Sequence, residues 1–263
     1  MSSSFNDLLN VFSGGKILQK KYVSEKKIEP KIKDELTNFY SELPKKYKKE
    51  YQNPSYKKHL MKIPFRVLIV GSSGSGKTQL VFELIKRMKG TFNKIILCVK
   101  NKSEPLYEWL ADTLTKDQLE IYEGAENVPN VDNYDSKDDP NGAQQILAIF
   151  DDLVLDKNQD KITQFFIRGR KISGGISCCY LTQSYYQTPK IIRLNCNYLF
   201  IKKLSSERDL SLILSEIALG VSKERLMEIY KMATNEKLNF LMVDVDAPGE
   251  NRFRVNFLKI IKT

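Results

Sequence analysis

From residue 63 onward, short apolar runs bounded by turn residues alternate with stretches of helical periodicity. Most of these runs are continuously apolar, as in strands that helices cover on both faces. The alternation predicts an α/β fold with a mostly parallel sheet and crossover helices. Strands are predicted at residues 65–70, 94–99, 146–150, 177–182 and 198–201, and helices around residues 77–89, 104–114 and 159–171.

Two amphipathic helices and a strand pair are predicted at the C-terminal end. The helices carry apolar stripes, made of Leu210, Ile213, Leu214 and Ile217 in the first and of Leu226, Ile229, Tyr230 and Ala233 in the second. Residues 240–245 and 252–257 follow as strands, separated by Asp246-Ala247-Pro248-Gly249. This arrangement predicts a closing β-hairpin.

Residues 1–60 differ in character, because glycine and proline interrupt them repeatedly. Two short stretches nevertheless show helical spacing, namely Phe5, Leu8, Leu9 and Phe12, and then Leu36, Phe39, Tyr40 and Leu43. We therefore expect two parts: a partly helical N-terminal arm over residues 1–60 and one P-loop domain over residues 61–263.

The net charge of +10 is concentrated in this arm. Residues 1–64 contain 14 lysines and 7 acidic residues, so the rest of the chain is nearly neutral. A basic extension on a nearly neutral domain favours contact with a polyanion such as nucleic acid, with a merely solubilising tail as the alternative.

Several classes of protein are excluded by composition. The longest apolar runs are about six residues against the roughly 20 that a bilayer span needs, so we expect no transmembrane helix. No secretory leader is visible, which favours an intracellular protein. The four cysteines match neither a disulfide framework nor a zinc site and are expected to be buried thiols. The single histidine, His59, argues against histidine-based metal catalysis.

One segment has the pattern of a phosphate-binding loop, G-x-x-x-x-G-K-[ST]. It reads Gly71-Ser72-Ser73-Gly74-Ser75-Gly76-Lys77-Thr78, between a predicted strand and a predicted helix. The glycines let successive N–H groups approach phosphate oxygens, and the helix N-terminus adds partial positive charge. Lys77 is expected to reach the β- and γ-phosphates of ATP, and the Thr78 hydroxyl to bind Mg²⁺.

A second strand ends in two carboxylates, Asp151 and Asp152. Asp151 is placed to hold Mg²⁺ through water, and Asp152 to activate the attacking water as general base. A pair of surface acids is the plain alternative, but the upstream phosphate-binding loop favours catalysis.

Other nucleotide-binding classes fit less well. Asn101-Lys102-Ser103-Glu104 and Asp246-Ala247-Pro248-Gly249 imitate GTPase motifs, but in reversed order and with Glu for Asp, so a GTPase is rejected. A small-molecule kinase is harder to exclude, although no arginine-rich lid follows Asp151.

The next predicted strand ends in Gln183, a polar residue that would lie at the γ-phosphate, where it could sense or orient water. This places the strand between the phosphate-binding loop and the carboxylate strand, the layout of motor ATPases. Together the motifs resemble the genome-packaging ATPases of large eukaryotic DNA viruses and virophages, a branch of the FtsK–HerA superfamily. The resemblance covers residues 63–260 and rests on residues 71–78, Asp151-Asp152, Phe165 with Arg168-Gly169-Arg170-Lys171, residues 180–184, and Pro189 with residues 192–195.

This resemblance implies an oligomeric ring that translocates double-stranded DNA into a capsid at the expense of ATP. It implies non-sequence-specific DNA binding, a capsid or vertex protein as partner, and the host-cell cytoplasm, at the viral factory, as location, with the virion as a second one. Cellular relatives usually carry Glu where Asp152 stands. Their trans-acting arginine corresponds best to Arg170, then to Arg168, and the role of Arg193 stays open. The alternatives are a DNA-processing translocase and a non-motor ATP-dependent DNA-binding protein.

Overall fold

The computed structural model describes residues 36–135, 144–218 and 220–262, in two units, Met1–Glu50 and Tyr51–Thr263. In the first unit, α2 (Phe39–Glu42) is a single helical turn without buried residues, and the 3-10 turn η1 (Lys45–Tyr47) follows it. The predicted stripe from Leu36 to Leu43 thus forms less helix than expected, because so short a stretch cannot offset the cost of helix nucleation. The helix predicted at Phe5–Phe12 lies outside the described residues.

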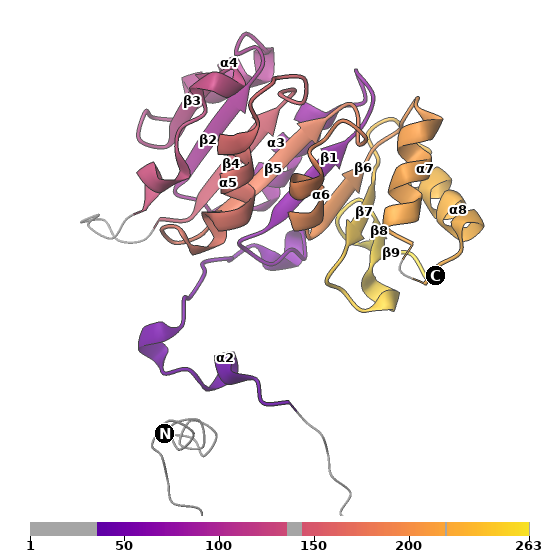
Figure 1. Ribbon diagram of the computed structural model, residues 1–263, viewed down its shortest axis with the longest axis horizontal. Helices are drawn as coiled ribbons and strands as arrows, with labels where there is room; N and C mark the ends of the chain where they lie inside the picture. Colours follow the sequence, from indigo (N-terminus) through magenta and orange to yellow (C-terminus); the bar gives the residue numbers. More distant parts are fainter. Residues whose placement is uncertain (1–35, 136–143, 219, 263) are drawn as a thin grey trace, which may run out of the picture. The chain divides into compact units, whose positions relative to one another are not determined.

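The second unit is built on one nine-stranded sheet, with strand order β3-β2-β4-β5-β1-β6-β7-β8-β9 (Figure 1). The first six of these are parallel neighbours, and the last three are antiparallel additions. In chain order the strands are β1 (Arg66–Val70), β2 (Lys94–Val99), β3 (Leu119–Glu123), β4 (Ile146–Asp151), β5 (Ile176–Thr182), β6 (Tyr198–Ile201), β7 (Leu241–Asp244), β8 (Phe253–Val255) and β9 (Lys259–Ile260).

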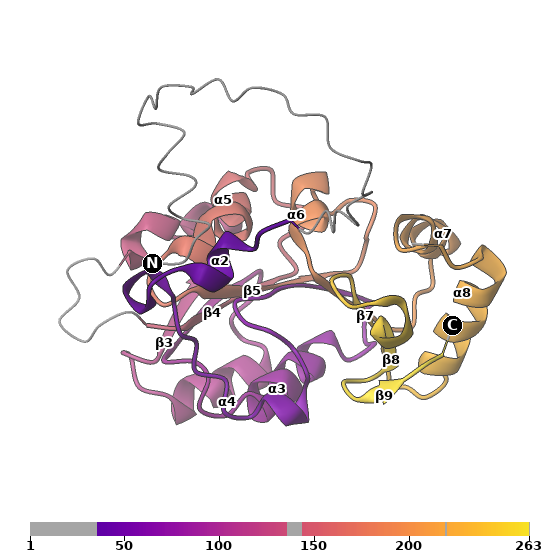
Figure 2. The ribbon, with the colours of Figure 1, turned by 90° about the horizontal axis from the view of Figure 1, so that it is seen from below.

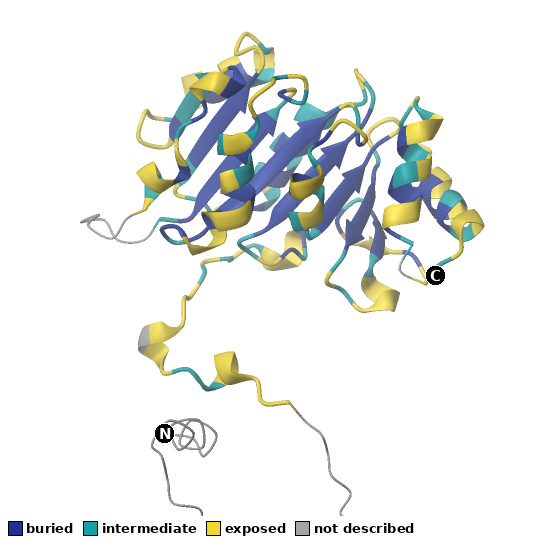
Figure 3. Cartoon of the chain, viewed as in Figure 1, coloured by how far each residue is buried: buried dark blue, intermediate teal, exposed yellow. Residues whose placement is uncertain are grey.

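Helices cover both faces of the sheet. The helices α3 (Lys77–Arg87) and α4 (Pro105–Thr113) lie on one side, and α5 (Asp160–Arg168), α6 (Lys190–Asn195) and α7 (Glu207–Glu216) on the other (Figure 2). The helix α8 (Lys223–Ala233) packs into the same core as α5 and α7. Alternate residues of each central strand enter the two cores, so the strands are buried throughout (Figure 3).

The predicted α/β fold is confirmed, with two differences at its edges. The edge strand β3 was not predicted, because its sequence Leu-Glu-Ile-Tyr-Glu is only half buried and lacks a continuous apolar run. The predicted helix at 159–171 ends at Arg168, and the 3-10 turn η5 (Gly169–Lys171) continues it. The closing strand pair is confirmed as β7 and β8, to which β9 adds a third strand.

Residues 51–60 of the predicted arm group with the sheet domain. The backbone of Gln52 exchanges two hydrogen bonds with the side chain of Gln145, of 2.5 and 2.9 Å. His59 is fully buried, and this burial together with the charge of Arg87 lowers its pKa to about 4. The neutral ring accepts a hydrogen bond from the Met61 N–H, so its role is structural.

The cysteines and the helices agree with the sequence-based expectations. Cys98, Cys178, Cys179 and Cys196 are buried and form no disulfide, and burial raises the pKa of each thiol. Within the described ranges, every helix is too short or too polar to cross a membrane.

Arg66 is a buried cation at the start of β1, with 1% of its surface exposed. Its guanidinium donates hydrogen bonds to the carbonyl oxygens of Phe166 at 2.9 Å, Phe65 at 2.9 Å and Ile176 at 2.8 Å. These acceptors belong to the last turn of α5, to the residue before β1 and to the first residue of β5. Arg66 therefore joins three segments at the amino edge of the sheet.

We expect Arg66→Met to destabilise the domain by about 1–3 kcal/mol, because three buried carbonyl oxygens lose a hydrogen bond and, among the described residues, only that of Phe65 keeps another, from the Cys178 N–H. Urea unfolding followed by circular dichroism measures the change, with Lys86→Met on the exposed surface of α3 as control. A variant as stable as the wild type would show that the three hydrogen bonds do no more than offset the burial of the charge.

Candidate nucleotide site

The connection between β1 and α3 has the backbone of a phosphate-binding loop. Gly74 and Gly76 adopt left-handed φ angles of +68° and +84°, which glycine tolerates without steric cost. A Cβ on Gly71 would lie 2.5 Å from Oγ of Ser75 and 2.8 Å from Cβ of Lys202, so a larger residue cannot fit without a shift. The helix α3 begins directly after Gly76, where its first N–H groups lack partners within the helix.

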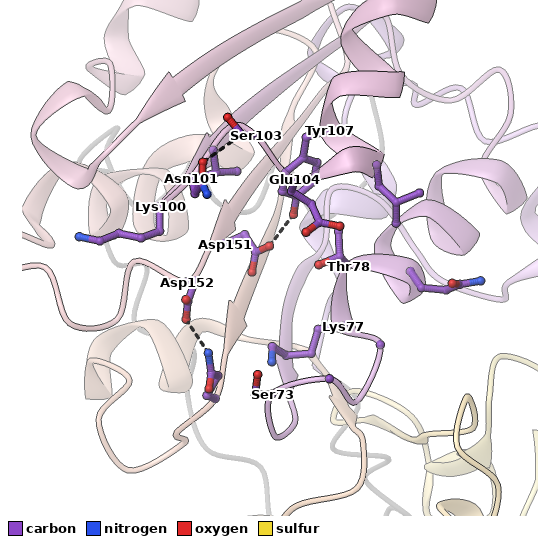
Figure 4. A pocket seen from close by; sticks show the side chains of 16 residues that line it. Ser73, Lys77, Thr78, Lys100, Asn101, Ser103, Glu104, Tyr107, Asp151 and Asp152 are labelled. Carbon is purple, nitrogen blue, oxygen red and sulfur yellow. Dashed lines mark hydrogen bonds between the residues drawn. The ribbon is translucent and has the colours of Figure 1, made fainter.

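Lys77, the first residue of α3, reaches back over this loop. Its Nζ donates hydrogen bonds to the carbonyl oxygens of Gly71 at 2.8 Å and Ser72 at 3.2 Å. Burial lowers the pKa of Lys77, while the charges of Asp151 and Asp152 oppose that shift. The amine thus lies between the loop and the two carboxylates (Figure 4).

Tyr107 links the two residues predicted to bind Mg²⁺. Its hydroxyl donates a hydrogen bond of 2.5 Å to Oδ2 of Asp151 and also interacts with the side chain of Thr78 (Figure 4). Burial raises the pKa of Asp151, against the opposing effects of Tyr107 and Lys77. A hydroxyl and a carboxylate are oxygen ligands that suit Mg²⁺, so this pair fits the ion by its chemistry.

Asp152 follows β4 in a left-handed conformation, with φ of +58°, a region that Asp enters more readily than most residues. Its Oδ1 accepts a hydrogen bond of 3.1 Å from Nε2 of Gln183, the residue after β5. Because β5 pairs with both β1 and β4, Gln183 lies between the phosphate-binding loop and the carboxylates. This is the strand order that the sequence predicts.

These groups surround one cavity of about 510 Å³ at the carboxyl edge of the parallel strands. It is lined by Ser73, Gly74, Gly76, Lys77, Thr78, Gln79, Val99, Lys100, Asn101, Ser103, Glu104, Leu106, Tyr107, Asp151, Asp152 and Gln183. The segment Asn101-Lys102-Ser103-Glu104, which imitates a GTPase motif, contributes Asn101, Ser103 and Glu104 to this lining. There Oδ1 of Asn101 accepts a hydrogen bond of 2.9 Å from the Ser103 N–H, so the side chain closes a local turn.

Two serines of the loop contact other groups. The Ser72 hydroxyl lies 2.9 Å from the Ser205 hydroxyl and accepts a hydrogen bond of 2.8 Å from the Ser205 N–H. Ser72 thereby connects the phosphate-binding loop to the segment that precedes α7. The Ser75 hydroxyl is buried and has no hydrogen-bond partner among the described residues.

The two candidate arginines lie away from this cavity. Both precede β5 at the amino edge of the sheet, Arg168 at the end of α5 and Arg170 in η5, whereas the cavity lies at the carboxyl edge. Arg168 forms a two-pronged ion pair with Asp132, with one hydrogen bond of 3.0 Å. Arg170 is exposed. Neither side chain lines the cavity of its own chain.

Three residues at or near the cavity were not predicted as site residues. Glu104 and Tyr107 come from the start of α4, which follows β2 at the same edge of the sheet as Asp151. Lys202 is buried behind Gly76, and its Nζ donates a hydrogen bond of 2.9 Å to the carbonyl oxygen of Leu238. Burial and the charge of Lys77 lower the pKa of Lys202 to about 8. The helix predicted at residues 104–114 could have indicated Glu104 and Tyr107, because its start follows a strand that ends at the same edge of the sheet.

Known structures share this fold. The chain is similar to the genome packaging NTPase B204 of Sulfolobus turreted icosahedral virus 2 in complex with sulfate, with a TM-score of 0.52 and 16% identity over 77% of this chain and all of that one. For the complex of B204 with ATP-gammaS, the TM-score is 0.51 and the sequence identity is 17%, over 76% of this chain and 100% of that one. A further structure is that of B204, the DNA-packaging ATPase from Sulfolobus turreted icosahedral virus. Its TM-score is 0.51 and its sequence identity is 18%, over 74% of this chain and 98% of that one. At these identities the likeness shows the fold alone.

Comparison of the amino-acid sequence identifies the family, which the likeness to these structures does not. No individual curated protein matches the chain. The model of the Poxvirus A32 protein family, however, matches residues 52–255, which include the phosphate-binding loop, both carboxylates, Gln183 and the closing strand pair. This match confirms the resemblance to viral genome-packaging ATPases that the motifs indicate. Because it covers most of the sequence, the chain belongs to the Poxvirus A32 protein family of viral genome-packaging ATPases.

Proposed function

We propose that this chain is one subunit of a ring that hydrolyses ATP to move double-stranded DNA into a capsid. The observation that carries the proposal is the convergence of Lys77, Thr78, Asp151, Asp152 and Gln183 on one cavity. They supply a cation for phosphates, oxygen ligands for a metal ion, and a carboxylate with an amide for a water molecule. These are the parts that phosphoryl transfer to water requires.

In this proposal the phosphates of ATP lie over the loop from Gly71 to Gly76. The N–H groups at the start of α3 and the Lys77 amine bind their oxygens. Lys77 now contacts the carbonyl oxygens of Gly71 and Ser72, so it has to exchange these neutral acceptors for charged phosphate oxygens. Hydrogen bonds to charged acceptors are stronger, which favours the exchange.

Asp152 and Gln183 handle the attacking water. The Asp152 carboxylate accepts a proton as the water oxygen forms its bond to the γ-phosphorus, and the bond to the β–γ bridging oxygen breaks, leaving ADP. The hydrogen bond from Gln183 orients the carboxylate, and the same amide can position the water. Thr78 and Asp151 would hold Mg²⁺, which neutralises charge on the β- and γ-phosphates when bound.

The partners are inferred from the charge and the family. DNA binding through lysines and arginines acts on phosphates and is therefore expected to be independent of sequence. Arg170 is exposed at the edge of the sheet opposite the nucleotide cavity of its own chain. This position suits a residue that contacts the nucleotide bound by a neighbouring subunit. In a ring of identical subunits, Arg170 would stabilise negative charge on the γ-phosphate bound by that neighbour. A capsid or vertex protein completes the proposed assembly.

Turnover of ATP is expected to rise when duplex DNA is added. Asp152→Asn should keep ATP binding but lower turnover at least about 100-fold, because the general base is lost, and Lys77→Ala should lose turnover as well. Phosphate release and binding of a fluorescent ATP analogue measure these effects, with the exposed Asp112→Asn as matched control. Wild-type turnover that ignores duplex DNA would contradict the motor, and full activity in Asp152→Asn would contradict the assigned base.

Tyr107→Phe is expected to raise the Mg²⁺ concentration needed for tight nucleotide binding about tenfold, because residues that orient metal ligands typically affect affinity 10–100-fold. Titration of Mg²⁺ with a fluorescent nucleotide measures this, and binding in EDTA should stay unchanged. Tyr134→Phe, which removes a similar tyrosine–carboxylate hydrogen bond to Glu120, is the control. An unchanged Mg²⁺ requirement would show that Tyr107 has no such role.

Arg170→Ala subunits should regain activity when mixed with Lys77→Ala subunits, because the latter still donate an intact Arg170 across the interface. Such arginines contribute about 10³-fold or more to turnover. The two inactive variants are titrated together and phosphate release is followed. Absence of activity at every ratio would indicate that Arg170 does not act on a neighbour's nucleotide.

A further inference from the structure

We infer that a hollow between the segment after β5 and the helix α7 binds the phosphate backbone of duplex DNA; this rests on the proposed function. The hollow has a volume of about 530 Å³ and shares no lining residue with the nucleotide cavity. Its lining residues come from the segment after β5 and from α6 and α7, two helices on the same side of the sheet (Figure 2). Its lining consists of Tyr186, Arg193, Arg208, Ser211, Leu212 and Ser215.

The charge at this hollow is positive and largely uncompensated. Arg208 is exposed, and within the described part of the chain it pairs with no carboxylate. Its guanidinium lies 3.8 Å from the centre of the Tyr186 ring, a stacking contact that orients the cation. Lys223, the first residue of α8, adds a second cation, because its Nζ donates a hydrogen bond of 3.1 Å to the Ser211 hydroxyl.

Two carboxylates of α7 close to the hollow already have internal partners. Glu216 forms an ion pair of 3.3 Å with Arg193 and accepts a hydrogen bond of 2.6 Å from the Tyr185 hydroxyl. Asp209, which is 5% exposed, accepts hydrogen bonds from the Tyr186 N–H at 2.8 Å and the Ser184 hydroxyl at 3.3 Å. No carboxylate lines the hollow itself. An anion can therefore approach Arg208 and Lys223 without meeting a free negative charge from the lining.

The groups present select the kind of anion. A guanidinium, an ammonium and the Ser211 hydroxyl, which accepts from Lys223 and keeps its own hydrogen, are donors for phosphate oxygens. They provide no paired donor and acceptor pattern for reading base edges. The only aromatic ring in the lining, Tyr186, is already stacked by Arg208, so it offers no platform for unpaired bases. These features favour a duplex backbone over a single strand.

The hollow is connected to the nucleotide cavity by a short segment. Gln183 contacts Asp152 in the cavity, and the residues that follow it are held by Asp209, directly next to Arg208 in α7. The phosphate-binding loop contacts the segment just before the same helix, through the hydrogen bond from the Ser205 N–H to the Ser72 hydroxyl. DNA in the hollow and nucleotide in the cavity would thus act on the same segment, and each changes the affinity for the other by the same factor.

The test is the salt dependence of duplex binding by Arg208→Gln/Lys223→Gln, measured by fluorescence anisotropy with a labelled duplex. Loss of two phosphate contacts should reduce the slope of log affinity against log salt by about 1.8 for each subunit in contact. The loss should be equal on AT-rich and GC-rich duplexes. The control Lys86→Gln/Lys116→Gln removes the same charge from the side of the sheet that carries α3 and α4. Each single variant is measured too, with thermal unfolding as a check on folding.

A reduced slope in the hollow variants but not in the control supports the inference. Equal slopes in both, with wild-type protein that binds duplex DNA, would overturn the inference and leave the proposed function intact. Wild-type protein that binds no duplex DNA would overturn both. Variants that lose subunit association while their duplex affinity is unchanged would show that the hollow instead binds a neighbouring subunit, and this also overturns the inference.

Discussion

The position of β5 between β1 and β4 is the constraint on which the site depends. Because the three strands run parallel, the groups at their carboxyl ends meet at one edge of the sheet. The phosphate-binding loop follows β1 and Gln183 follows β5, while Asp151 ends β4 and Asp152 comes directly after it. Residues far apart in the sequence are thereby brought together, and the hydrogen bond of 3.1 Å between Gln183 and Asp152 is the direct result. A different strand order would separate the water-handling groups from the phosphates.

The amino edge of the same strands serves a second purpose. Arg66, at the start of β1, binds the end of α5 and the start of β5 through Phe166 and Ile176. The turn that carries Arg170 lies between these two points, and its charge acts on Arg66. One rigid sheet thus carries the nucleotide site at one edge and the proposed trans-acting arginine at the other. This arrangement suits a ring in which each subunit completes the site of the next.

The comparisons and the structure answer different questions. The fold is shared with B204 at low identity, which establishes the architecture. Membership of the Poxvirus A32 family selects genome packaging over the DNA-processing translocase and the non-motor protein that the motifs alone left open. The side-chain geometry of this chain adds contacts that neither the B204 structures nor the family match supply. Examples are the position of Tyr107 between Thr78 and Asp151 and the ion pair of Arg168 with Asp132.

Elements whose signals are local could be predicted from the amino-acid sequence. Continuous apolar runs indicated five of the six parallel strands, and contiguous residues spelled out the phosphate-binding loop and the carboxylate pair. Other features became visible only in the folded chain, namely the half-buried β3, the partners of Arg66, the hydrogen bond from Tyr107 to Asp151 and the hollow beside α7. The physical reason is that a loop or a buried strand is specified by neighbouring residues, whereas the partner of a side chain depends on which distant segments the packed sheet brings beside it.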